Sequence, residues 1–303
     1  MKNEDEKFDY EKTFKTKTGD TFLNIQSFLY ITSKQITTFL YHTPVTPHQI
    51  ILVSMLFGVI SAFLIIQPDI VPVICGAVLL FYKNVLDKVD GSLARAKGLD
   101  SRRGRFYDSL ADFIVTLALF LAISYHLYEK YHNPLMFIFG FTAMISSMIQ
   151  CSFFIFYQVS FIKISGKETV NRLIEKITVE DKTSPDKWTL FLQRLFQIIY
   201  GWQDLIFYKI DSFMKVLLQK RKSQFVIHNS KFEEIWYKNK LFLTFSSILS
   251  IGTHMVLIAV FSLFRSLELY FFVNLILMNL LLICCIAIKY ITAKKHLAKN
   301  FAN

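Results

Sequence analysis

The stretch "DKVDGSLARAKGLDSRRGRFYDSLAD", residues 87–112, lies between two strongly apolar runs, "VPVICGAVLLFY" before it and "FIVTLALFLAISY" after it. Carboxylates are costly near hydrocarbon, so acidic residues at such a boundary are candidates for a functional site. Asp87 and Asp90 are three residues apart, and Asp108 and Asp112 are four apart. On helices, residues at these spacings share one face. Two such helices would bring four carboxylates into one cavity.

The composition indicates an integral membrane protein. Of the 303 residues, 53% are hydrophobic and 31 are Phe. Several segments approach the roughly 20 apolar residues that a helix needs to cross a bilayer. We predict six membrane spans, at about 48–66, 69–86, 108–128, 134–160, 242–264 and 269–289.

The distribution of positive charge predicts the orientation of these spans. The chain has 34 Lys and Arg residues and a net charge of +11, and all but Lys130 and Arg265 fall on one side of the predicted membrane. This is the positive-inside pattern, which places both termini and the aspartate stretch in the cytoplasm. Attraction to anionic lipid headgroups accounts for the remaining basic character. Nucleic acid is therefore not an expected partner.

The sequence divides into four parts. Residues 1–45 form a cytoplasmic N-terminal segment with an amphipathic helix over 21–41, and residues 46–160 hold the first four transmembrane helices with the aspartates. Residues 161–241 form a cytoplasmic or interfacial insert, and residues 242–303 hold the last two transmembrane helices and a basic tail. The expected fold class is an all-α integral membrane protein, with six transmembrane helices around a cytoplasm-facing polar cavity and amphipathic surface helices.

Two of these segments have unusual helices. The apolar run "IVPVICGAVLLFY", residues 70–82, has 13 residues before Lys83, which is too few to cross a bilayer. We expect its helix to continue through "KNVLDKVD" into a polar cavity. The insert shows helical periodicity on both sides of Gly201, which predicts two amphipathic helices. These helices lie on the membrane surface or form a small cytoplasmic subdomain.

The residues around the aspartates predict a metal-held diphosphate site. Four carboxylates in one cavity need cations or strongly raised pKa values. Their hard oxygen atoms suit Mg²⁺ or Mn²⁺, which usually bind carboxylates together with substrate phosphates. Gly91 lets a ligand approach the backbone, Ala94 is small, and Arg95 offers a fork suited to phosphate oxygens. Gly104 permits the start of the next helix.

The order of these residues resembles the signature of the CDP-alcohol phosphotransferases, also called CDP-alcohol phosphatidyltransferases. The resemblance extends to the six-span layout and to "TPVTPHQI", residues 43–50, but it does not obviously cover the insert. All eight fixed positions of the signature are present: Asp87, Asp90, Gly91, Ala94, Arg95, Gly104, Asp108 and Asp112.

The resemblance implies a reaction in phospholipid biosynthesis. Family members bind a CDP-linked donor with a divalent metal, an acceptor hydroxyl attacks the phosphorus, CMP leaves, and the proteins often form homodimers. The donor is CDP-diacylglycerol with a soluble alcohol as acceptor, or a CDP-alcohol that passes phosphocholine or phosphoethanolamine to diacylglycerol. The stretch "GRFYDSLAD", residues 104–112, is more similar to the users of CDP-diacylglycerol, so we favour that direction.

The resemblance also implies a role for each matching residue. Asp87, Asp90 and Asp108 would hold the metal, and Asp112 would complete the metal site and accept the proton of the acceptor hydroxyl. The other four signature positions would contact or make room for the donor; they are Gly91, Ala94, Arg95 and Gly104. Further donor contacts would come from Ser101, and from Pro47, His48, Gln49 and Ile50 in a segment that resembles a donor-contacting stretch. His48 stands where Asn or Asp is commoner in the family.

A cation transporter that uses the aspartates as a permeation site is the alternative from another class of protein. Such a protein needs acidic residues distributed over several spans. The last three predicted spans have almost none. The sequence therefore favours a transferase.

Overall fold

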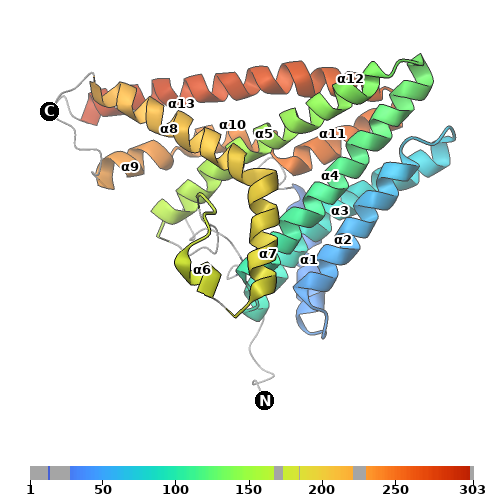
Figure 1. Ribbon diagram of the computed structural model, residues 1–303, viewed down its shortest axis with the longest axis horizontal. Coiled ribbons are helices and arrows are strands. Elements are labelled where there is room, and N and C mark those ends of the chain that lie inside the picture. Colours follow the sequence, from blue (N-terminus) through green and yellow to red (C-terminus); the bar gives the residue numbers. More distant parts are fainter. Residues whose placement is uncertain (1–12, 14–27, 167–172, 184, 221–229, 301–303) are drawn as a thin grey trace.

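The computed structural model describes residue 13 and residues 28–166, 173–183, 185–220 and 230–300. All regular secondary structure in these ranges is helical, which confirms the all-α fold (Figure 1). Of the amphipathic helix predicted over 21–41, α1 (Tyr30–Tyr41) is described, and residues 21–27 lie outside the described ranges.

Four long helices follow α1 and form two antiparallel pairs: α2 (Pro47–Leu64), α3 (Ile70–Lys97), α4 (Arg102–Tyr131) and α5 (Leu135–Ile164). The prediction that the short second span continues as a helix is confirmed, because α3 runs on to Lys97 and ends at Gly98 with φ +66°. A glycine in this left-handed conformation is a common helix end.

The last two predicted spans are less regular. They comprise α10 (Lys240–Ser246), the 3₁₀ turn η4 (Ser247–Leu249), α11 (Ile251–Leu263), α12 (Leu267–Phe272), the π-helix η5 (Val273–Met278) and α13 (Asn279–Asn300). The segment predicted as a span over 242–264 is broken in the structure, because the chain bends by 44° between Leu249 and Ile251. Ser246 and Ser247 donate their hydroxyls to backbone carbonyls just before the bend. Such bonds compete with the regular helix.

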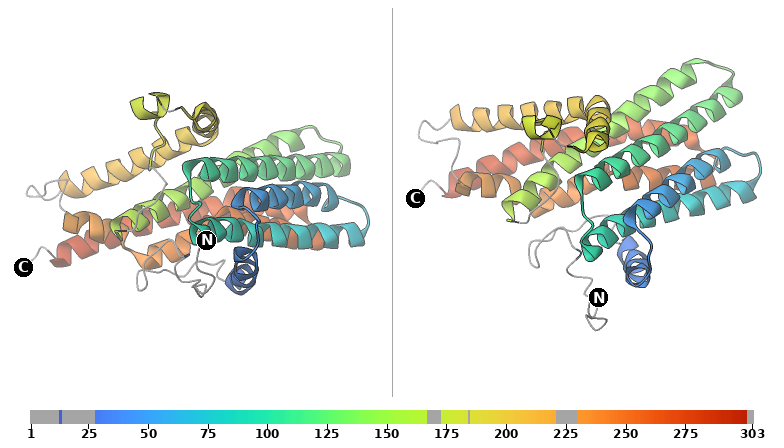
Figure 2. Two further views of the ribbon diagram at one scale, coloured as in Figure 1. Left: turned by 90° about the horizontal axis from the view of Figure 1, so that it is seen from below. Right: turned by 60° about the horizontal axis from the view of Figure 1, so that its bottom comes forward.

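Five helices of the described chain are long and apolar enough to cross a membrane, or six if the bent segment counts as one span. The turn between α2 and α3 and the turn between α4 and α5 lie at the same end of the bundle (Figure 2), and side-chain contacts connect both to the turn between α11 and α12. Arg265 donates to the carbonyl oxygens of Gln67 at 2.5 Å and Pro68 at 2.7 Å, and Lys130 pairs with Glu268 at 2.8 Å. The aspartate stretch lies toward the opposite end.

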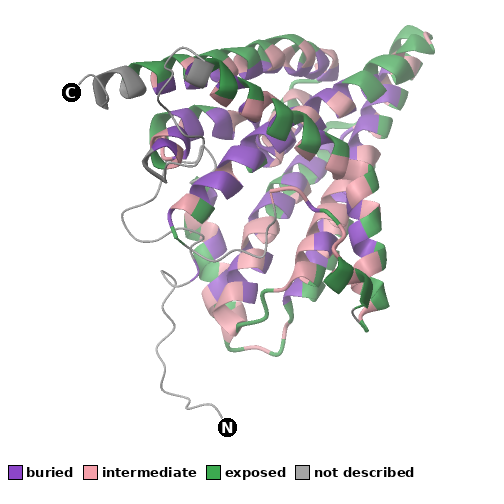
Figure 3. Cartoon of the chain, turned by 60° about the vertical axis from the view of Figure 1, so that its left-hand side comes forward, coloured by how far each residue is buried: buried purple, intermediate pink, exposed green. Residues whose placement is uncertain are grey.

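Close packing and polar contacts hold the bundle together. A Cβ on Gly58 of α2 would lie 2.5 Å from Val115 of α4, so only glycine allows these helices to approach so closely. Gln150 of α5 donates to Asn279 of α13 at 3.0 Å. Hydrogen bonds of this kind join helices inside a membrane. Figure 3 shows the buried residues on the inward sides of the long helices.

The insert contains α6 (Val179–Thr183), α7 (Lys187–Phe196), the π-helix η3 (Gln197–Gly201), α8 (Trp202–Lys220) and α9 (Ser230–Tyr237). Two helices therefore meet at Gly201, as predicted. The helical spacing after Gly201 predicts an apolar face made of Trp202, Ile206, Ile210, Phe213 and Leu217, and this face of α8 is largely exposed, as Phe213 shows at 63% exposure. A different face is buried and consists of Gln203, Phe207, Asp211, Met214 and Leu218. Contact of the exposed face with a membrane surface stays a prediction.

The buried face of α8 contains both polar and apolar residues. Its polar residues can be buried because they have hydrogen-bond partners inside the protein. Gln203 accepts a hydrogen bond from Ser152 of α5 at 2.6 Å. Asp211 accepts hydrogen bonds from Trp236 at 2.7 Å and Tyr237 at 2.8 Å, both on α9. Buried polar groups with such partners are tolerated. The insert thus packs directly on the helix bundle.

Candidate active site

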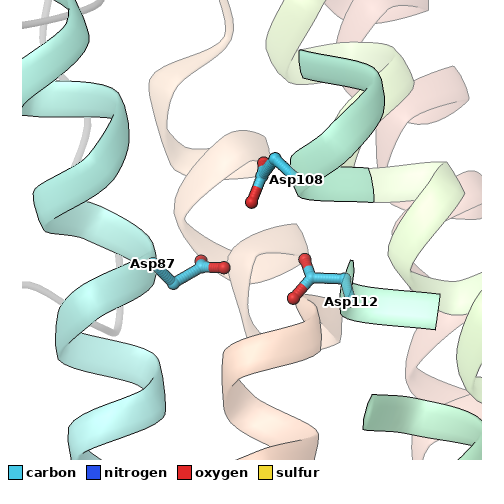
Figure 4. Close-up of side chains that lie close together, drawn as sticks. All are labelled: Asp87, Asp108 and Asp112. Atoms are coloured by element: carbon cyan, nitrogen blue, oxygen red, sulfur yellow. The ribbon is translucent and has the colours of Figure 1, made fainter. Parts of the chain in front are cut away.

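Three of the four aspartates converge where α3 passes α4. One carboxylate oxygen from each of Asp87, Asp108 and Asp112 lies within 4.8 Å of the others. Figure 4 shows Asp87 reaching from α3 toward the two aspartates of α4. Because Asp108 and Asp112 are four residues apart, they lie on one face of α4. The predicted convergence is confirmed for these three residues.

Asp90 lies one turn further along α3 and is 4% exposed. Its Oδ1 accepts a hydrogen bond from the backbone N–H of Gly91. Its Oδ2 is buried and has no hydrogen-bond partner within the described ranges. A buried carboxylate oxygen without a partner is costly, and a bound cation would satisfy it. Asp90 therefore lies beside the group of three, with an oxygen free to complete a cation site.

A lysine lies among these carboxylates. Lys83 of α3 is 1% exposed, and its Nζ lies 3.2 Å from Asp87 Oδ1. It also forms an ion pair with Asp112 of α4. In the sequence, Lys83 marks the end of an apolar run, and its role beside the aspartates was not predicted. Its spacing of four residues from Asp87 is the signal that could have identified this contact.

Gly91 and Arg95 lie next to each other on α3. A Cβ on Gly91 would lie 3.3 Å from Arg95 Nη1, so the glycine leaves room for the guanidinium. Arg95 Nε donates to the carbonyl oxygen of Thr13. Ala94 is buried in the same part of α3. The contact of these residues with a donor stays a prediction.

Ser101 and Gly104 define the start of α4. Ser101 is the residue that caps the helix, and its Oγ accepts a hydrogen bond from the Gly104 N–H at 3.1 Å. A Cβ on Gly104 would lie 3.3 Å from that Oγ and 3.8 Å from His48 Nε2. The first turn of α4 is therefore fixed by a local hydrogen bond and by the close approach of α2.

Of the side chains of residues 47–50, that of His48 lies against α4, between the signature positions Gly104 and Asp108. Pro47 opens α2, and Gln49 completes a capping box with Thr46. Ile50 is buried in a cluster with residues of α3. His48 instead packs its ring edge-on against Tyr107 of α4, with ring centroids 5.3 Å apart. His48 is thus placed for a site contact, while its three neighbours position the helix.

A comparison with known protein families agrees with the grouping of carboxylates described above. The family model described as CDP-alcohol phosphatidyltransferase matches residues 44–217, which is more than half of the chain. The chain belongs to this family. No curated protein matches the chain in sequence. The matched range includes α6, α7 and most of α8, so much of the insert lies inside the region that the family model covers.

The family is one of membrane transferases of substituted phosphate groups, and its members generally depend on divalent metal ions. The residues of this protein fit such an ion. The group of three carboxylates supplies hard oxygen ligands, and Asp90 supplies a buried oxygen without a partner. The sequence pattern and the family together identify a multi-pass integral membrane enzyme.

Ion pairs join the first turn of α4 to the insert. Arg102 pairs with Asp181 at 2.6 Å and with Glu175 at 2.5 Å, and Arg105 pairs with Glu175 at 2.6 Å. The Glu175 side chain is fully buried. Hydrogen bonds from Thr189 and the ion pair with Arg103 also lower the pKa of Asp186, which caps α7. Local sequence patterns give no signal for contacts over such separations.

The corner between α7 and α8 also reaches the aspartates. Tyr200 of η3 donates its hydroxyl to the carbonyl oxygen of Ser109 at 3.0 Å, and Ser109 lies between Asp108 and Asp112 on α4. Burial and the neighbouring charge of Asp112 raise the pKa of the Tyr200 hydroxyl well above its ordinary value. Tyr200 is therefore a neighbour of the site that was not predicted from the sequence.

Proposed function

We propose that this protein transfers a phosphatidyl group from CDP-diacylglycerol to the hydroxyl of an alcohol acceptor and releases CMP in a reaction that depends on Mg²⁺ or Mn²⁺. The observation that supports this proposal most strongly is the convergence of Asp87, Asp108 and Asp112 from two helices of a family member. Carboxylates grouped in this way can hold a divalent ion against a diphosphate.

The aspartates would hold the ion. Asp87, Asp108 and Asp112 are grouped closely enough to share it, and the unpartnered oxygen of Asp90 would complete the set. When bound, the ion would neutralise the diphosphate and align it for attack. Lys83 forms ion pairs with the carboxylates of Asp87 and Asp112 and so holds them in place.

The transfer itself would use the side chains around this group. Asp112 would accept the proton of the acceptor hydroxyl, provided that the hydroxyl lies within hydrogen-bond reach. The acceptor oxygen then forms a bond to the phosphatidyl phosphorus, and the bond from that phosphorus to the CMP oxygen breaks. Arg95 offers a cationic fork for the diphosphate, and Gly91 allows close approach to the backbone. Ser101 would contact the donor as well. His48 would contact the donor nucleotide.

The charge distribution supports an orientation for this reaction. Nearly all Lys and Arg residues lie on the side of the aspartates, which favours a cytoplasmic site and cytoplasmic termini. The prediction of a homodimer rests on the family resemblance. Mass measurement of the detergent-solubilised protein tests it, and a monomer at working concentration would contradict it.

One experiment separates the possible donors. Purified protein is incubated with labelled CDP-diacylglycerol and, in separate reactions, glycerol phosphate, inositol phosphate or serine, and both CMP and the lipid product are identified. Parallel reactions contain labelled CDP-choline or CDP-ethanolamine with diacylglycerol. The proposal expects product only in the first set. Product only in the second set would reverse the assigned direction, and cation flux into liposomes without CMP release would favour a transporter.

A further inference from the structure

The corner between α7 and α8 is built into the helix bundle beside the aspartates. Ile199 and Tyr200 pack against the core cluster to which α2, α4, α5 and α11 contribute. Phe196, directly before the corner, packs against Phe106 of α4 with ring centroids 5.5 Å apart. The corner is the π-helical turn η3 (Gln197–Gly201). Single π-helical turns within α-helices often occur at functional sites.

Tyr200 forms a hydrogen bond with the turn of α4 that carries the aspartates. Its hydroxyl donates to the carbonyl oxygen of Ser109 at 3.0 Å. Ser109 directly follows Asp108 and precedes Asp112 by three residues. A side-chain hydrogen bond from outside the helix thus fixes the segment of backbone from which both aspartates project.

The corner is itself held firmly, so the position of Tyr200 is well defined. Gln203, which is fully buried, accepts a hydrogen bond from Ser152 of α5 at 2.6 Å. Gln197 donates to the carbonyl oxygen of Glu175 at 2.5 Å. The ring of Tyr200 packs on Phe196 with centroids 5.1 Å apart. A side chain locked by packing and hydrogen bonds can hold a functional group to within a fraction of an ångström.

We propose that Tyr200 is a positioning residue of the transferase site. Through Ser109 it keeps Asp108 and Asp112 at the separation from Asp87 that a divalent ion requires. This inference rests on the proposed assignment of these aspartates to the metal. This proposal also gives the insert a role, because its α7–α8 corner would then help to position the aspartates of the site.

The test compares Tyr200→Phe with Tyr208→Phe. Tyr208 lies on α8 and is 46% exposed, so its variant is a matched control. For each protein, CMP release gives kcat, the KM for the donor and the half-saturating Mg²⁺ concentration. Mn²⁺ binding without substrate and the Tm are measured separately. For Tyr200→Phe we expect kcat to fall about tenfold, because small displacements of reacting groups have effects of this size or larger.

We also expect Tyr200→Phe to need several times more Mg²⁺ and to bind Mn²⁺ more weakly, with the donor KM and the Tm unchanged. Ser152→Ala loosens the corner from α5 and leaves Tyr200 intact, so it should shift the Mg²⁺ requirement in the same direction. Wild-type protein that releases no CMP from any donor would overturn the proposed function. Active wild-type protein with unchanged metal binding in both variants would overturn this inference alone, as would a fall in Tm and kcat without a change in metal binding.

Discussion

Lys83 Nζ lies 3.2 Å from Asp87 Oδ1, one helical turn away on α3, and pairs with Asp112 of α4 as well. The lysine is 1% exposed, so its ammonium group interacts with carboxylates and very little with water. Lys83 therefore joins the two helices at the point where the aspartates converge. It also reduces the repulsion between their charges before any divalent ion binds.

Replacing Lys83 should make the protein depend on metal for stability. Lys83→Met leaves two carboxylates without their cation, and breaking a buried pair in this way costs about 3 kcal/mol or more. We expect a lower Tm than wild type without metal and a larger increase in Tm on adding Mg²⁺. Lys88→Met, at a half-buried position on the same helix, is the control. Equal Mg²⁺ effects in wild type and Lys83→Met would contradict this role.

Two aspartate variants should separate proton transfer from metal binding. Asp112→Asn removes the proposed base, so transfer should be abolished. Because Asp87, Asp90 and Asp108 would still hold the ion, stabilisation by the donor with metal, measured as a shift in Tm, should largely persist. Asp90→Asn should lose both activity and metal-dependent stabilisation, because its unpartnered oxygen is proposed to bind the ion. Turnover retained by Asp112→Asn would reject its assignment as the base.

Much of the site could be predicted from the sequence because the relevant residues are close together in it. The signature places Asp87 near the end of one helix and Asp108 and Asp112 near the start of the next, so their spacing determines which faces they share. The continuation of α3 past its apolar run followed from length alone. Both features are local, and both are found in the structure.

Other features depend on contacts between distant segments. Tyr200 meets Ser109 across 91 positions, and Glu175 meets Arg102 across 73. No periodicity or spacing in one sequence predicts such pairs. The buried face of α8 was missed for a related reason: Gln203 and Asp211 are polar, and only their partners on α5 and α9 make burial favourable.

The ion pairs between the insert and α4 should contribute to stability. Glu175 is fully buried and binds both Arg102 and Arg105, so Glu175→Gln removes a counter-charge from each guanidinium group, although Arg102 keeps its pair with Asp181. We expect the free energy of unfolding to fall by about 3 kcal/mol. Thermal unfolding in detergent measures it, with Glu180→Gln at an exposed position of α6 as the control. Similar Tm values for the two variants would show that the ion pairs contribute little.

Asp204 should make stability depend on pH. Burial raises the pKa of Asp204 to about 7, partly offset by Arg105, whereas an unfolded Asp ionises near its ordinary value. The folded protein therefore holds this proton more tightly than the unfolded chain does. Its stability falls as the pH rises from about 4 to 7, by about 4 kcal/mol at most.

The variant Asp204→Asn lacks this ionisation. Its Tm should exceed that of wild type by a larger margin at pH 8 than at pH 5. Unfolding curves of both proteins at the two pH values give the comparison. A margin that is equal at both pH values, or larger at pH 5, would show that the carboxyl group ionises normally in the folded protein.

Direct measurement of Mn²⁺ binding tests the central claim, that aspartates from α3 and α4 share a divalent ion. Free Mn²⁺ is followed by electron paramagnetic resonance during titration of wild type, Asp108→Asn and Asp69→Asn, the last at an exposed position at the far end of α3. The account predicts that Asp108→Asn weakens binding at least about tenfold, as loss of a metal-site group does, and that Asp69→Asn binds like wild type. Wild-type affinity in Asp108→Asn would contradict the account.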